Sequence, residues 1–184
     1  MLKKLLWAVT LLVVPVITAS ATALEGAKSI YLQDRAGAET KIGELQFTRE
    51  SNHSSSYQLH LDHTLFKDYF LSMKEMKCLE GPELWCAIPY PYERPKTVSA
   101  KDLRWLEHDL LFMFKKLDSF GANFWNGIYY QLEIVDNRLQ GTARSLDLNL
   151  LASPPEDLAV PPVGEFDIDD ADLDQRWLPY LIIR

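Results

Sequence analysis

The chain has 184 residues, of which 26 are acidic and 19 basic, and its formal net charge is −7. Hydrophobic residues make up 47% and charged residues 24%, a balance that excludes a disordered or fibrous protein. The acidic excess and the lack of any Lys or Arg cluster argue against nucleic acid and anionic membrane surfaces as partners. No motif identifies a reaction or a protein family.

The first residues have the three-part composition of a secretory signal peptide. Lys3 and Lys4 precede an apolar run at 5–17, and small residues follow up to Ala23. The run is shorter than the roughly 20 residues that span a bilayer, and Pro15 interrupts it. We therefore predict a signal peptide at 1–23 that is cleaved, no membrane span in the mature chain, and a periplasmic or secreted location. A retained N-terminal anchor is the alternative.

Two cysteines, Cys78 and Cys86, flank a Gly81-Pro82 turn. A hairpin that turns there places the two thiols opposite each other, within reach of a bridge. Because an exported chain with two nearby cysteines most simply forms a disulfide, we predict one here. The alternatives are two free thiols or half of a metal site.

Strands are expected early in the chain. The segments 29–33, 40–48 and 56–63 are rich in Ile, Leu, Tyr, Phe and Thr and are separated by polar turns. The segment 66–76 is ambiguous between helix and strand, although the cysteine hairpin favours a strand. Three prolines then indicate an extended loop at 88–95, which carries Tyr90 and Tyr92.

A helix is predicted over 101–117, where apolar residues recur at helical spacing. Trp105 and Phe112 fall on the side opposite the main apolar stripe, so either flanking loops cover them or they form an exposed docking strip. His108, which lies between Glu107 and Asp109, is expected at the surface.

A hairpin is predicted from strands at 128–135 and 138–148 around an Asp136-Asn137 turn. The apolar C-terminal residues 177–183 are expected to return to the core as a last strand. These patterns predict one mainly β (α+β) domain over 24–184, with a Pro-rich and acidic segment at 153–175. The expected architecture is an antiparallel sheet curled into a barrel or sandwich, with one amphipathic helix packed against it.

Aromatic residues are abundant, and no nucleophile motif, phosphate loop or metal-ligand spacing accompanies them. We therefore predict a non-catalytic ligand- or partner-binding accessory module of the cell envelope, without a cofactor, whose partner is an envelope protein or a small apolar ligand. The candidate binding residues are Tyr90, Tyr92, Trp105, Phe112, Trp125 and Tyr129. The alternative role for these residues is to fill the core.

Two other functions remain open. An extracytoplasmic hydrolase would use Glu133 with His60 or His108 in acid–base roles. A Ca²⁺-binding protein would use the aspartates at 167–174, although their spacing lacks the Gly and Glu of an EF-hand loop.

Overall fold

The computed structural model describes residues 23–51, 53–72 and 75–184. The signal peptide predicted at 1–23 therefore lies outside the described residues, except for Ala23. Within the described ranges, no helix combines the length and the apolar character needed to cross a membrane.

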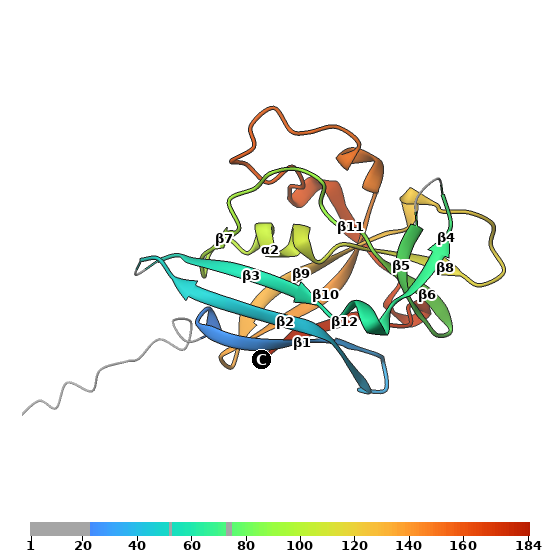
Figure 1. The fold of residues 1–184 in the computed structure, drawn as a ribbon, viewed down its shortest axis with the longest axis horizontal. Helices are drawn as coiled ribbons and strands as arrows, with labels where there is room; N and C mark the ends of the chain where they lie inside the picture. Colours follow the sequence, from blue (N-terminus) through green and yellow to red (C-terminus); the bar gives the residue numbers. More distant parts are fainter. Residues whose placement is uncertain (1–22, 52, 73–74) are drawn as a thin grey trace, which may run out of the picture.

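The described residues form one 12-stranded sheet whose strands all pair antiparallel (Figure 1). In spatial order the strands run β4-β5-β6-β8-β9-β10-β12-β1-β2-β3-β7, and β11 pairs with β10 off this path. The strands are β1 (Gly26–Gln33), β2 (Glu39–Arg49), β3 (Ser55–Leu61), β4 (Lys67–Phe70), β5 (Glu75–Glu80), β6 (Glu83–Ala87), β7 (Thr97–Val98), β8 (Phe112–Lys116), β9 (Gly127–Val135), β10 (Arg138–Leu146), β11 (Ile168–Asp170) and β12 (Tyr180–Ile183). The mainly β, antiparallel character is confirmed. The sheet is open, with β4 and β7 at its two ends, so a closed barrel is excluded.

The strands expected near the start of the chain and in the later hairpin are confirmed. In β2, Ile42, Leu45 and Phe47 point into the core, while Glu44 and Gln46 between them stay exposed. Asp136 and Asn137 both adopt positive φ, at 47° and 65°, which matches the twist of the β9–β10 hairpin. The C-terminal strand β12 lies between β10 and β1, so the apolar C-terminus does return to the core.

The helix predicted over 101–117 is wrong beyond Asp109. The α-helix α2 covers only Arg104–Asp109, and Phe112–Lys116 is strand β8, which pairs with β6 along its length and with the start of β9. The run Leu-Leu-Phe-Met-Phe at 110–114 is continuously apolar, and such a run suits a strand with both faces buried as well as a helix. Long-range pairing with β6 decides between them, because it gives the backbone of this segment partners far along the chain.

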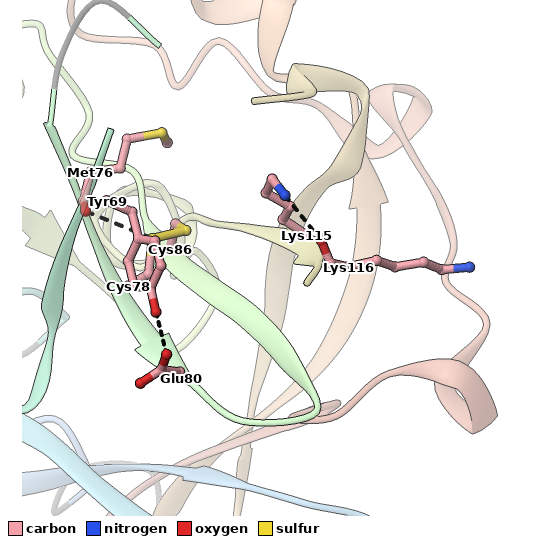
Figure 2. Close-up of a disulfide and its surroundings, with 7 residues drawn as sticks. All are labelled: Tyr69, Met76, Cys78, Glu80, Cys86, Lys115 and Lys116. Carbon is pink, nitrogen blue, oxygen red and sulfur yellow. Dashed lines mark hydrogen bonds between the residues drawn. A yellow bond between two sulfur atoms is a disulfide. The ribbon is translucent and has the colours of Figure 1, made fainter. Parts of the chain in front are cut away.

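The disulfide is confirmed. Cys78 on β5 lies directly opposite Cys86 on β6, and a bridge joins them across the hairpin (Figure 2). The ambiguous segment 66–76 contains β4 and the start of β5, as the hairpin argument favoured, although Met73 lies outside the described residues. The hydroxyl of Tyr69 on β4 donates a hydrogen bond of 2.5 Å to Glu80 on β5 at this edge of the sheet.

Two irregular segments enclose α2. The Pro-rich loop after β6 and the segment 153–164 both pass beside the helix, which lies against β9 (Figure 1). Both segments contribute polar contacts to the helix, described below.

Candidate functional site

Three consecutive polar side chains of α2 are buried: Glu107, His108 and Asp109 are 4%, 0% and 8% exposed. Such burial is unusual for ionisable residues unless each is hydrogen-bonded. Each of the three contacts a different part of the fold. The helix therefore joins the sheet, the Pro-rich loop and the 153–164 segment at one place.

Glu107 accepts hydrogen bonds from the edge of β9 that no strand pairs with. Strand β8 pairs with β9 only as far as Ile128, so the next part of that edge has no neighbouring strand. Oε1 of Glu107 accepts a hydrogen bond of 2.6 Å from the backbone N–H of Leu132, and Oε2 accepts one from the hydroxyl of Tyr129. Burial raises the pKa of Glu107 above its ordinary value, against the opposing effect of these two hydrogen bonds.

His108 is fully buried, so the expectation that it lies at the surface is wrong. Its Nδ1 lies 2.6 Å from the carbonyl oxygen of Arg104, and its Nε2 accepts a hydrogen bond from the backbone N–H of Val163. These partners fit the neutral tautomer with the proton on Nδ1. Burial lowers the pKa of His108. Helical periodicity placed it among polar neighbours, but the segment that covers it lies more than fifty residues further along the chain.

Asp109 binds Arg94 of the Pro-rich loop that follows β6. One of its carboxylate oxygens pairs with the guanidinium of Arg94, and the other accepts a hydrogen bond of 2.9 Å from the hydroxyl of Tyr57 on β3. Nη1 of Arg94 also donates to the backbone carbonyls of Tyr90 and Tyr92, at 3.3 and 2.9 Å. One buried ion pair therefore fixes the loop after β6 against both α2 and β3.

A cavity of about 450 Å³ lies beside this ion pair, and we call it the apolar pocket. Arg94, Asp109 and Tyr90 form part of its wall. The rest of the wall comes mainly from β3, β5, β6, β8 and the 3-10 helix at Phe124–Asn126. It includes the apolar residues Leu59, Leu61, Met76, Leu111, Phe112 and Phe124 and also the charged residues Glu75, Lys77 and Lys96. A mostly apolar cavity of this size with a few convergent polar groups is typical of a small-molecule site.

A second cavity, of about 490 Å³, lies between the start of α2, β9 and the residues around Gly164, and we call it the polar cleft. The charged residues of its wall are Lys101, Asp102, Arg104, Glu107, Glu133 and Glu165. The cleft thus places the buried carboxyl of Glu107 in the same cavity as Glu133, the carboxylate that the sequence offered for acid–base chemistry.

The candidate binding residues do not form one surface. Tyr90 and Phe112 line the apolar pocket, Tyr129 lines the polar cleft, and Trp105 packs its ring against Tyr90 and His108. Trp105 and Phe112 are 6% and 0% exposed, so they are covered and form no exposed strip.

The other two candidates differ in exposure. Tyr92 is half-buried with its ring edge-on to Tyr90, and Trp125 is 70% exposed. A role in binding remains a prediction for all six candidate residues.

Sequence reasoning missed Arg94, Glu107 and Asp109. Their signal was weak, because a charged residue in a Pro-rich loop or on a short helix ordinarily faces solvent. His60 and Glu133 are exposed. Among the residues that the structure describes, no group of three or more His, Cys, Asp or Glu side chains is arranged to hold a metal, and Asp170 of the acidic segment instead pairs with Arg144 at 2.7 Å.

Comparison with known proteins gave no match. No protein-family model, curated protein or solved structure matches the chain. The two cavities and the buried polar residues between them are therefore the basis for a functional proposal.

Proposed function

We propose that this chain is an exported, non-catalytic accessory module of the cell envelope that binds a small, largely apolar ligand in the apolar pocket. The observation that carries this proposal is the composition of that pocket. Its volume of about 450 Å³ lies within the range of small-molecule sites. Leu59, Leu61 and Ile88 supply apolar surface, and the Arg94–Asp109 pair supplies polar groups in one part of the wall.

The fold and the N-terminal sequence support the proposal. We take the open sheet to be sandwich-like, because residues from β1, β2, β8, β9 and β12 share one core. The expected signal peptide and the Cys78–Cys86 disulfide both fit an oxidising location outside the cytoplasm, such as the periplasm.

Native mass spectrometry of the protein purified from its host's envelope fraction tests this function directly. We expect a bound apolar molecule, whose mass gives its class. A complementary assay follows the fluorescence of N-phenylnaphthylamine, a neutral apolar dye, on binding to the purified protein. Failure to bind the dye, together with the absence of any co-purified molecule, would contradict the proposal.

A pocket-filling variant shows whether the dye occupies this pocket. Ala87 on β6 lines the apolar pocket, so Ala87→Phe is expected to weaken dye binding about tenfold by filling the space. Ala38→Phe makes the same change at an exposed turn position outside the pocket wall and is expected to leave binding unchanged.

A hydrolase acting in the polar cleft is a second candidate function. The supporting observation is that Glu107, buried and with a raised pKa, shares the cleft with Glu133, which is exposed. Two carboxyl groups in different environments can divide the acid and base roles. A panel of ester, glycoside and peptide substrates would test it. Activity that disappears in both Glu107→Gln and Glu133→Gln would support this function, whereas activity that survives both would exclude it.

A further inference from the structure

The outer edge of β3, the side that faces away from β2, has no neighbouring strand beyond Tyr57. The N–H of Asp62 donates to the carbonyl oxygen of Ile42 on β2, and hydrogen-bonded pairs alternate with non-bonded pairs along an antiparallel ladder. The even-numbered residues of β3 therefore bond to β2. The backbone N–H and C=O groups of Tyr57, Leu59 and Leu61 point outward instead.

The Pro-rich loop leaves β3 directly after Tyr57. The outward N–H of Tyr57 donates to the carbonyl oxygen of Lys96 at 3.0 Å, which continues the pairing of β3 with β7. In the same register Arg94 would lie opposite Leu59, but an ion pair holds Arg94 at α2. Lys96 has a φ of 50°, at which the backbone departs from the extended conformation. Within the described ranges, no residue accepts a hydrogen bond from the outward N–H of Leu59 or Leu61.

This free edge of β3, formed by Leu59 and Leu61, borders the apolar pocket. Both residues are partly exposed, and both line the cavity of about 450 Å³. The opposite wall includes Met76, Ala87 and Ile88. The edge and the pocket therefore form one site, with backbone donors and acceptors on one side and apolar side chains on the other.

The spacing of the outward groups identifies the kind of molecule that fits. At the unpaired edge of β9 the chain itself supplies an acceptor, because Glu107 bonds to the N–H of Leu132. The free edge of β3 instead presents two N–H groups on alternate residues, about 7 Å apart at the rise of a strand. The backbone of an extended peptide repeats its own N–H and C=O groups at that spacing, whereas a small molecule with one polar group reaches only one of them.

We propose that the free edge of β3 binds an extended peptide segment of another protein by strand addition, with two alternate apolar side chains of the peptide in the apolar pocket. Peptide residues that hydrogen-bond to Leu59 and Leu61 lie directly opposite them, so their side chains point to the same face of the sheet as these leucines. Backbone pairing supplies affinity, and the pocket selects apolar residues at alternate positions. This inference goes beyond the proposed function, because it adds a protein partner to the small apolar ligand.

The blocked heptapeptide acetyl-Lys-Thr-Val-Thr-Val-Thr-Lys-amide tests the proposal by isothermal titration calorimetry with the purified protein. Two N-methylated forms separate strand pairing from apolar contact. N-methylation of both Val residues removes the N–H groups that face β3, and we expect it to weaken binding at least about tenfold. N-methylation of two Thr residues makes the same change on the opposite edge of the peptide and should alter binding less than about threefold.

Amide hydrogen exchange, followed by NMR, locates the pairing on the protein. Without peptide, we expect the N–H groups of Leu59 and Leu61 to exchange faster than those of Gln58 and His60, which bond to β2. Bound heptapeptide should slow exchange at Leu59 and Leu61 at least about tenfold. The N–H of Leu132 on β9 is the control, and its exchange should not change.

The outcomes separate this inference from the proposed function. Binding of N-phenylnaphthylamine without binding of the heptapeptide would overturn strand addition and leave the small-ligand pocket in place. Equal weakening by the two N-methylated forms, or binding with no change in exchange at Leu59 and Leu61, would also overturn strand addition. Peptide binding with the expected pattern, but no binding of the dye, would support strand addition and contradict the small-ligand function alone. Failure to bind either probe would overturn both.

Discussion

The imidazole of His108 and the backbone of Val163 are joined by a hydrogen bond of 3.2 Å, in which the N–H of Val163 donates to Nε2. This contact ties the Pro-rich segment 153–164 to the helix and requires an unprotonated Nε2. The same ring is enclosed by Tyr90, Trp105 and Tyr129. Protonation of His108 therefore removes the acceptor for Val163 and places a charge in a buried aromatic environment.

The first prediction is that His108 makes stability depend on pH. Burial lowers its pKa below the ordinary 6.5, so the unfolded chain binds the proton first as the pH falls. The contribution of His108 to stability is complete above about pH 6.5 and decreases as the pH falls below that value toward the folded pKa, by at most about 1.4 kcal/mol per pH unit. Urea unfolding at a series of pH values measures this slope.

Variants separate His108 from its neighbours. His108→Gln should lose the slope, whereas His60→Gln, at an exposed position on β3, should retain it. Glu107 acts with the opposite sign, because its raised pKa stabilises the fold below about pH 4.5 and that stability is lost as the pH rises to its folded pKa. A slope that persists unchanged in His108→Gln would contradict the assignment.

The second prediction concerns Glu107. Glu107→Leu leaves the N–H of Leu132 and the hydroxyl of Tyr129 without an acceptor in a buried site, and we expect a loss of about 3 kcal/mol in the free energy of unfolding. Glu107→Gln keeps a carbonyl oxygen and should lose less. Glu133→Leu, at an exposed position on β9 next to Leu132, is the control, and a similar loss there would contradict the role of Glu107 as the acceptor for the unpaired edge of β9.

The third prediction divides the candidate aromatic residues into core and surface. Trp105→Ala and Phe112→Ala should each lower the free energy of unfolding by about 3–5 kcal/mol, because both side chains are buried. Trp125→Ala should change it by less than about 0.5 kcal/mol, since that ring is largely exposed. Denaturant unfolding measures all three, and a neutral Phe112→Ala would be inconsistent with the packing of β8.

The fourth prediction is that Tyr90→Phe does not destabilise the ligand-free protein. The hydroxyl is buried without a partner, so its removal takes away an unsatisfied group while the ring contacts with Trp105 and His108 remain. We expect a change between zero and a gain of about 1 kcal/mol, measured on protein stripped of bound molecules. A clear loss of stability would mean that the hydroxyl has a partner in the protein.

The fifth prediction is that the bridge between β5 and β6 contributes modestly to stability. Replacing both Cys78 and Cys86 with Ala opens a short loop, for which the chain-entropy estimate is about 2–3 kcal/mol. Thermal and urea unfolding of the double variant against the oxidised wild type measures it. If reduction of the wild type gave no change, the bridge would be absent from the purified protein.

The sequence by itself determined the local elements of this protein. A composition rich in Ile, Leu, Phe and Thr between polar turns located β2, and the Asp136-Asn137 pair located the tight turn between β9 and β10. The cysteine spacing around Gly81 located the disulfide. These features depend on residues close together in the chain, so periodicity and turn preference are sufficient to find them.

Only the tertiary structure decided the rest. The apolar run at 110–114 fits a helix or a strand, and pairing with β6, more than twenty residues earlier, selected the strand. His108 and Asp109 resemble surface residues of a helix, and partners from distant segments, Val163 and Arg94, made them buried and hydrogen-bonded. The pocket likewise forms where β3, β6, β8 and the Pro-rich loop meet, and no local pattern encodes a cavity between segments brought together by folding.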